Sequence, residues 1–341
     1  MRVIKPWNSI NVPDELYSPK GMIGPEERRA LYWLGQSYYR GQGVIVDAGA
    51  FVGSSAFCLA AGVAHNTTGT INRPCVFSFD YFKAVDDYVA KQISSDFHPI
   101  GTGDDYFDIF MDQIRKYTEF ICAQQGDFLQ SKWASGPIEI LFIDIAKTQD
   151  LNSHLIREFF PHLIPGQSVV IHQDFYHCWH PYIHITMEAL TPYFEIIDSH
   201  VEYQSRLYLY KTAIPNSELE IAVNYAYTAE QRLALLDRLS AHETGDMRAM
   251  AKVVKLWQLV LDENDAAAQD VYASIKRKYG LVGRSKLWRQ QANEVMTIHA
   301  EKKKLTLALA TRPAALWPPT LASETARWLT RRLRERGFWR H

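Results

Sequence analysis

Short apolar runs rich in β-branched and aromatic residues alternate with helical stretches through the first part of this 341-residue chain. Five of these runs predict strands, at Val44–Asp47, Cys75–Asp80, Phe120–Gln124, Ile138–Asp144 and Ser168–His172. Strands that alternate with helices pair in parallel, and the helices then cover both faces of the sheet. The pattern therefore predicts an α/β fold.

The alternation ends with two strand-like runs, Phe194–Val201 and Arg206–Lys211, which only a short turn separates. A turn of this length cannot hold a helical crossover, so these two strands should pair antiparallel. With the five earlier runs they predict a doubly wound, seven-stranded, mostly parallel sheet with an antiparallel last strand. We expect a helix that begins at Pro25 to pack on this sheet, and another at Asn152–Leu163.

The residues after about Pro215 show no further strand alternation. Residues 218–300 instead have the composition of helices. The predicted helix breaks lie at Thr228, Thr244-Gly245, Asn264 and Gly280. This part of the chain is therefore predicted to be a helical annex.

The chain divides by composition into an N-terminal segment with its helix (1–40), a sheet domain (41–213), a helical annex (214–310) and a basic amphipathic tail (311–341). Arginines and apolar side chains are mixed in the tail; the arginines are Arg327, Arg331, Arg332, Arg334, Arg336 and Arg340. Such a tail can bind an anionic surface or nucleic acid. We favour a solvated helix whose aromatic residues dock on the protein itself or on a second subunit.

The overall charge excludes no partner by itself, but it favours none either. Acids and bases nearly balance at a net charge of −1, so no global field points to nucleic acid or a membrane surface. No run of eighteen apolar residues predicts a membrane span. The four cysteines have no CxxC spacing, and we expect them to be reduced thiols in or near the core of a cytoplasmic protein.

A glycine-containing loop follows the first predicted strand, in the segment Asp47-Ala-Gly49-Ala-Phe51-Val-Gly53-Ser54. Glycines between a strand and a helix let the backbone approach a ligand and leave helix amides available to it. The G-x-x-x-G spacing does not match the dinucleotide fingerprint, and no Lys-Ser/Thr pair follows Gly53 as in a phosphate loop. A plain tight turn is the alternative.

The D-x-G-x-x-x-G pattern resembles the first motif of class I S-adenosylmethionine-dependent methyltransferases. The resemblance implies that the loop residues line S-adenosylmethionine, namely Asp47, Gly49, Phe51, Gly53 and Ser54. It also implies that Asp80, at the end of the second strand, accepts both ribose hydroxyls, although a helix cap is the alternative for this carboxylate. Asp127, just after the third strand, would then accept a hydrogen bond from the adenine amino group.

The segment Asp144-Ile-Ala-Lys147 is similar to the D-x-x-K stretch of catechol and caffeoyl-coenzyme A O-methyltransferases. That likeness implies that Asp144 holds a divalent metal and that Lys147 acts as a base. If no metal is bound, the alternative is that Asp144 positions the substrate or acts as the base itself. Asp174 stands where that group and the macrolide-sugar O-methyltransferases place further metal carboxylates, and oxygen ligands of this kind suit Mg²⁺. This chain departs from the pattern, because Gln173 brings no charge, so the magnesium site is either weaker or absent.

Imidazoles are concentrated in the segment His177-Cys-Trp-His180-Pro-Tyr-Ile-His184. Histidine titrates near neutrality, so His177 or His180 can take the proton from an attacking hydroxyl. We interpret His184, ahead of a helix at Ile185–Leu190, as structural. A zinc site is the remaining alternative, but no paired thiolates support it.

The function that these patterns predict is O-methylation of a hydroxyl on a small molecule or sugar, with Mg²⁺ assisting if it is bound. The alternatives are a metal-independent N-methyltransferase and a cofactor-binding scaffold without turnover. We interpret Trp257, Trp288 and Trp328 as exposed aromatics that cap the active site or form a homodimer. Nucleic acid is not an expected partner.

Overall fold

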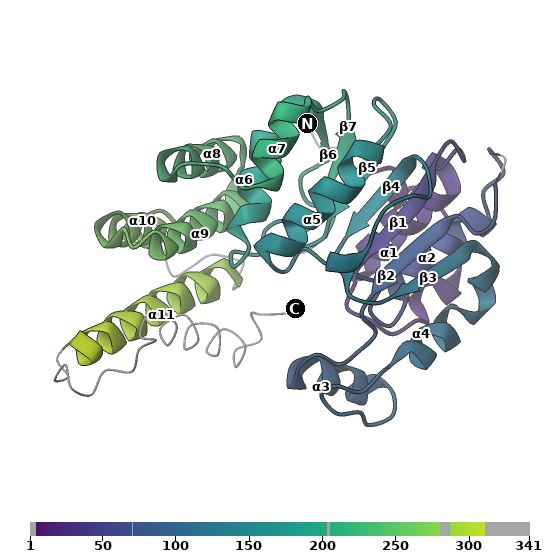
Figure 1. Ribbon diagram of the computed structural model, residues 1–341, viewed down its shortest axis with the longest axis horizontal. Coiled ribbons are helices and arrows are strands. Elements are labelled where there is room, and N and C mark those ends of the chain that lie inside the picture. Colours follow the sequence, from purple (N-terminus) through teal and green to yellow (C-terminus); the bar gives the residue numbers. More distant parts are fainter. Residues whose placement is uncertain (1–4, 70, 203–204, 280–286, 311–341) are drawn as a thin grey trace. The chain divides into compact units, whose positions relative to one another are not determined.

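The computed structural model describes residues 5–69, 71–202, 205–279 and 287–310. The chain forms two compact units, one of Met1–Phe175 with Ala189–Ala226 and one of Tyr176–Glu188 with Tyr227–His341. The first unit contains the sheet, and the second contains helices (Figure 1). The finer division into four segments stays a prediction.

A seven-stranded sheet with the order β3-β2-β1-β4-β5-β7-β6 forms the centre of the first unit (Figure 1). The strands are β1 (Val44–Ala48), β2 (Val76–Asp80), β3 (Ile121–Gln125), β4 (Ile138–Ile143), β5 (Val169–His172), β6 (Phe194–Asp198) and β7 (Arg206–Tyr210). β1 to β5 pair in parallel, whereas β7 is antiparallel to both β5 and β6. The predicted fold class is confirmed.

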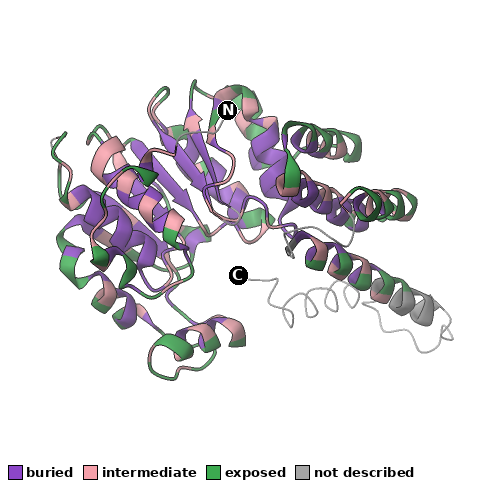
Figure 2. Cartoon of the chain, turned by 180° about the vertical axis from the view of Figure 1, so that it is seen from behind, coloured by how far each residue is buried: buried purple, intermediate pink, exposed green. Residues whose placement is uncertain are grey.

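One face of the sheet packs against α1 (Pro25–Trp33), α2 (Ser54–Ala64) and α4 (Phe107–Ile114). Alternate strand residues such as Ile45 and Ile140 join this core, because side chains on a strand point to opposite faces in turn. Every residue of β4 is buried, as expected for a central parallel strand with both faces covered. Figure 2 shows the strands of this unit as buried along most of their length.

The other face of the sheet is covered by α5 (Gln149–Phe159). The ring of Phe159 contacts those of Phe79 on β2 and Trp133, each with a centroid distance of 5.5 Å. The helix predicted at Asn152–Leu163 begins three residues earlier, because the Thr148 side chain accepts a hydrogen bond from the amide of Leu151. A 3₁₀ turn, Phe160–His162, follows its end.

The remaining helices of the first unit are α3 (Asp87–Asp96) and α7 (Asn216–Val223). The second unit contains most of α6 (Pro181–Ala189) and all of α8 (Ala229–His242), α9 (Gly245–Leu261), α10 (Asp265–Tyr279) and α11 (Leu287–Ala310). The predicted breaks at Thr228, Thr244 and Asn264 all precede helices, and Thr228 caps α8 through the amide of Gln231. Gly280 and the tail at 311–341 lie outside the described residues.

Two predictions for the second unit were wrong. Trp257 and Trp288 are only 2% exposed: the ring of Trp257 contacts that of Trp179, in the turn before α6, and the ring of Trp288 contacts that of Tyr279 at the end of α10. Trp328 lies outside the described residues. His184 does not precede a helix but lies inside α6, which begins four residues earlier than predicted, at Pro181.

None of the helices among the described residues combines the length and apolar character needed to cross a membrane. Of the four cysteines, three are buried, Cys122 is partly exposed, and none forms a disulfide in the described structure.

Candidate functional site

The glycine loop lies at the carboxyl end of β1 and packs directly on the end of β4. Gly49 and Gly53 have φ angles of +104° and +103°, and Phe51 between them has a φ of +46°. A Cβ on Gly49 would lie 2.7 Å from the carbonyl carbon of Asp144. Only glycine fits such a contact at a positive φ, so this residue brings the loop next to the D-x-x-K segment.

The side chain of Asp47 supports the loop from below. Asp47 is 0% exposed, and its Oδ2 accepts a hydrogen bond of 3.1 Å from the hydroxyl of Ser78. Burial raises its pKa to about 7. The carboxyl group of Asp47 is thus buried beneath the loop, and its predicted place in the cofactor site stays a prediction.

Asp80 ends β2 beside the same loop and is held by three donors. Its Oδ2 accepts from the amide of Phe51 at 2.8 Å, and its Oδ1 accepts from the amide of Phe82 and the hydroxyl of Tyr106, each at 2.9 Å. The carboxylate is partly exposed, as a ribose contact requires. It is not a helix cap.

Asp127 lies past the end of β3 and is exposed. Its Oδ1 accepts a hydrogen bond from the amide of Leu129 at 3.0 Å, so it caps the short 3₁₀ turn Phe128–Gln130. The predicted adenine contact of Asp127 stays a prediction.

The polar residues after β4 and β5 form one cluster, as the sequence predicted. The ammonium of Lys147 forms ion pairs with Oδ1 of Asp144 and with Oδ2 of Asp174. The two carboxylates thus face a common point, and the lysine ammonium is at that point. Its side chain is only 10% exposed, so solvent screens these contacts weakly.

The protonation state of Lys147 follows from this arrangement. Burial alone would lower its pKa, but the carboxylates of Asp144 and Asp174 outweigh that effect and hold the pKa above its ordinary value. A lysine with a raised pKa keeps its proton near neutral pH. The geometry therefore supports a fixed positive charge at Lys147 in this structure, and the role of Lys147 as base stays a prediction.

Two neighbours complete the β5 side of the site. The backbone amide of Gln173 donates to the carbonyl of Ile143 at 2.9 Å, which places this residue, whose side-chain oxygen is the predicted metal ligand, beside the end of β4. Burial lowers the pKa of His172 to about 3, so this imidazole is neutral at physiological pH. Among the described residues, no three His, Cys, Asp or Glu side chains gather as metal ligands.

Glu27 is a site residue that the sequence patterns did not reveal. This carboxyl group of α1 is 2% exposed and accepts hydrogen bonds from the amide of Gly24, at 2.9 Å, and from the hydroxyl of Ser205. Burial, with smaller contributions from the nearby charges of Asp144 and Glu202, raises its pKa to about 7. In the sequence, Glu27 is one of the acidic residues that commonly occupy the first turn of a helix, so nothing marks it as part of a site.

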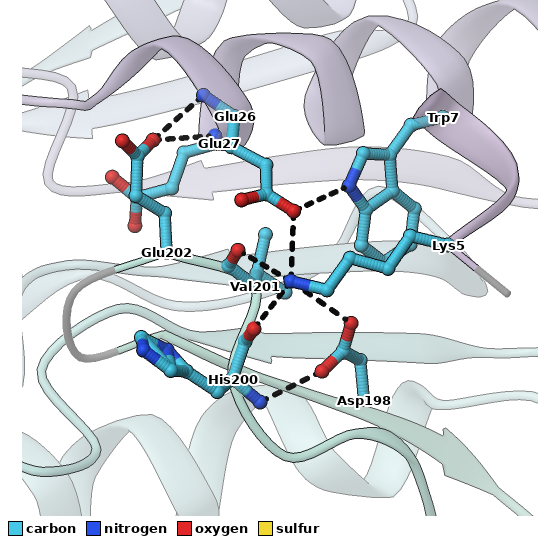
Figure 3. A network of polar contacts seen from close by, with 8 residues as sticks. All are labelled: Lys5, Trp7, Glu26, Glu27, Asp198, His200, Val201 and Glu202. Carbon is cyan, nitrogen blue, oxygen red and sulfur yellow. Dashed lines mark hydrogen bonds and ion pairs between the residues drawn. The ribbon is translucent and has the colours of Figure 1, made fainter. Parts of the chain in front are cut away.

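A polar network fixes the surroundings of Glu27 (Figure 3). The ammonium of Lys5 bonds to Glu26 at 2.7 Å and to the carbonyl of Val201 at 2.8 Å. Glu202 accepts from the amides of Glu26 and Glu27, at 2.6 and 3.1 Å. The network therefore joins the N-terminal segment and the start of α1 to the turn between β6 and β7.

The raised pKa of Glu27 predicts a stability that depends on pH. The folded protein keeps a proton on Glu27 between the ordinary pKa of 4.5 and about 7, whereas the unfolded chain releases it. Stability from this group is therefore full below pH 4.5, falls by roughly 3 kcal/mol in total between pH 4.5 and about 7, and stays lost above that pH, where both states are ionised. Urea unfolding of wild type and Glu27→Gln at pH 5 and pH 8 measures it.

When the free energy of unfolding of wild type is subtracted from that of Glu27→Gln, the contributions of the titrating groups that both proteins share, such as Asp47, cancel. The amide of Gln can still accept from Gly24, so the helix start is retained. We expect the free energy of unfolding of the variant, relative to that of wild type, to increase between pH 5 and pH 8. A constant difference between the two proteins would show that Glu27 is ionised throughout.

The predicted histidines lie in the second unit. The rings of His177 and His180 stack at a centroid distance of 4.8 Å, and Nδ1 of His180 lies 2.7 Å from the hydroxyl of Tyr182. His184 is 0% exposed, and its Nδ1 lies 3.0 Å from the carbonyl oxygen of His180. The predicted role of His177 or His180 as base stays a prediction.

Comparison with known proteins supports the cofactor assignment. Residues 46–173, which run from within β1 to just past the end of β5 and include the glycine loop, Asp80, Asp144 and Lys147, match the family described as Methyltransferase domain. The chain carries a methyltransferase domain. Such domains use S-adenosylmethionine as the methyl donor, so the protein is an S-adenosylmethionine-dependent methyltransferase.

Among solved structures, the methyltransferase is similar to cofactor-bound Rv0187 from MTB. The two share 14% sequence identity at a TM-score of 0.39, over 58% of this chain and 85% of that one. A search of curated proteins found no match to the methyltransferase.

Proposed function

We propose that this methyltransferase methylates a hydroxyl of a small molecule or sugar, and that Lys147 supplies the positive charge a divalent metal would otherwise supply. The observation that carries this proposal is the ammonium of Lys147 between the carboxylates of Asp144 and Asp174. The cluster lies at the carboxyl ends of neighbouring parallel strands, where open α/β sheets bind their ligands.

The residues beside this cluster fit S-adenosylmethionine. The loop from Gly49 to Gly53 gives close backbone access, and α2 begins at Ser54 without a side-chain cap, so its first amides suit a carboxylate. Asp80 offers a ribose contact at the end of β2. When bound, the cofactor supplies a methyl group on a positively charged sulfur, which keeps the S–C electron pair as the methyl leaves.

The cluster suits a hydroxyl as the methyl acceptor. A carboxylate oxygen of Asp144 or Asp174 accepts the hydroxyl hydrogen bond and takes the proton as the new O–C bond forms. The ammonium of Lys147 stabilises the negative charge that develops on the attacking oxygen. Because Lys147 is already fixed by two ion pairs, it needs little rearrangement to do so.

The same residues do not fit Mg²⁺ while Lys147 stays in place. The donor set would be two carboxylates and the amide of Gln173, which suits a hard cation in its chemistry. The ammonium of Lys147 nevertheless occupies the point between the carboxylates, and a metal there would have to displace it. We therefore propose that methyl transfer to the hydroxyl proceeds without a metal.

Transfer of a labelled methyl group tests the proposal. The protein is incubated with methyl-labelled S-adenosylmethionine and a panel of sugars, polyols, catechols and amines, each with EDTA or with Mg²⁺. We expect label on a hydroxyl compound at equal rates in both conditions. Label on amines alone would favour N-methylation, and loss of transfer in EDTA would contradict the role given to Lys147.

A further inference from the structure

Tyr106 is a buried tyrosine whose hydroxyl points at Asp80. It is 4% exposed, and its hydroxyl donates to Oδ1 of Asp80 at 2.9 Å. Burial raises its pKa well above the ordinary value, and the Asp80 carboxylate raises it further, so the hydroxyl stays protonated as a donor. None of the sequence motifs includes this residue.

A long connecting segment brings Tyr106 to Asp80. Residues 83–105 lead the chain away just after β2 and bring it back to the same place. Hydrogen bonds of 2.8 Å close this segment, from the amide of Ala84 to Asp104 and from that of Tyr106 to Phe82. The Tyr106 ring then contacts Phe51 of the glycine loop, edge to face, at 5.7 Å. One residue thus touches both the carboxylate and the loop.

The hydrogen bonds that Asp80 already accepts determine how many acceptor sites its carboxylate has left for a ligand. A carboxylate has about four acceptor sites, two on each oxygen. On Oδ1, the amide of Phe82 and the hydroxyl of Tyr106 use two; on Oδ2, the amide of Phe51 uses one. One acceptor site remains, on Oδ2, so Asp80 has room for one ribose hydroxyl rather than for the two that the resemblance implies.

We propose that Tyr106 is a positioning residue of the cofactor site, which fixes the Asp80 carboxylate so that Oδ2 receives a single ribose hydroxyl. The inference rests on the S-adenosylmethionine-binding role of the methyltransferase domain and does not depend on which acceptor is methylated. Loss of the tyrosine hydroxyl opens a site on Oδ1 and frees the carboxylate to turn, which weakens its hold on the ribose.

Tyr117 provides a matched control within the same unit. It is also 4% exposed, and its hydroxyl donates to a different carboxylate, Oε1 of Glu15, at 2.6 Å. Tyr106→Phe and Tyr117→Phe each remove one buried hydroxyl and one bond to an acid. Both should lower the melting temperature by about 2–4 °C. Only Tyr106→Phe should change the binding of the cofactor product.

Calorimetric titration with S-adenosylhomocysteine measures that difference. We expect Tyr106→Phe to weaken binding about tenfold and Tyr117→Phe to leave it within about twofold of wild type. The same titration with an analogue that lacks both ribose hydroxyls separates the two explanations, because a general loosening of the site would weaken the binding of both ligands equally. The affinity ratio between the two ligands should shrink in Tyr106→Phe and stay unchanged in Tyr117→Phe.

A double-mutant cycle with Asp80→Asn locates the effect. If Tyr106 acts through Asp80, Tyr106→Phe should have little further effect in the Asp80→Asn background. Equal losses in the two Phe variants, an unchanged ligand ratio or fully additive losses would each overturn the positioning role and leave the methyltransferase assignment intact. A wild type that binds no S-adenosylhomocysteine would overturn both.

Discussion

Replacing Lys147 with Met is expected to lower kcat/KM for methyl transfer by about 10²–10³-fold, a loss typical of removing one fixed electrostatic group. The affinity for S-adenosylhomocysteine should change by less than about threefold, because Lys147 contacts Asp144 and Asp174 rather than the cofactor loop. Radiolabelled methyl transfer and calorimetry on the same preparation measure the two quantities. Met keeps an unbranched side chain, one heavy atom shorter than that of lysine, and removes the charge together with its hydrogen-bond donors.

Two further variants at this position separate charge from packing and from metal binding. Lys147→Arg keeps the cation and should retain part of the activity. Lys147→Ala leaves Asp144 and Asp174 facing each other without a counter-ion, so Mg²⁺ should raise its melting temperature, while wild type should not respond to Mg²⁺. Full activity of Lys147→Met, or stabilisation of wild type by Mg²⁺, would contradict the role proposed for this lysine.

Gly49→Ala is expected to disable the cofactor loop and the acceptor cluster together. The new Cβ would lie 2.7 Å from the carbonyl carbon of Asp144, and the residue would have to keep a φ of +104°. We expect a loss of about 2–4 kcal/mol in the free energy of unfolding, from the clash and the backbone strain combined. The affinity for S-adenosylhomocysteine should fall at least about tenfold as the loop moves.

Gly166→Ala separates the two causes of that loss. Gly166 also has a positive φ, +77°, but no atom lies within 4 Å of its added Cβ. Urea unfolding of both variants should show Gly49→Ala as clearly the less stable, and the excess measures the contact with Asp144. Equal losses would mean that backbone strain alone explains the requirement for glycine at position 49.

The fold was predictable because its signals are local. Buried parallel strands such as β4 are continuous apolar runs, and turn residues such as Thr228 and Thr244 mark where helices begin. The meeting of Asp144 and Asp174 followed from a single rule, that the carboxyl ends of neighbouring parallel strands share one edge of the sheet. These inferences need no knowledge of side-chain orientation.

What the sequence did not predict depends on the directions in which side chains point. Nothing in the D-x-x-K spacing shows that the ammonium of Lys147 forms ion pairs with two carboxylates, the observation on which its proposed role as a fixed cation rests. Asp47 turns inward to Ser78 for the same kind of reason. Glu27 and Tyr106 lie far in the chain from the residues that they contact, Ser205 and Asp80, so no short motif contains them.

Titration of S-adenosylhomocysteine into the wild-type protein, once with EDTA and once with Mg²⁺, tests the central claim most directly. The site described here predicts one-to-one binding with a micromolar dissociation constant, on the order of −8 kcal/mol, and the same affinity in both solutions. Absence of binding in both solutions would contradict the assignment of the cofactor site. Binding that requires Mg²⁺ would contradict the claim that Lys147 takes the place of a metal.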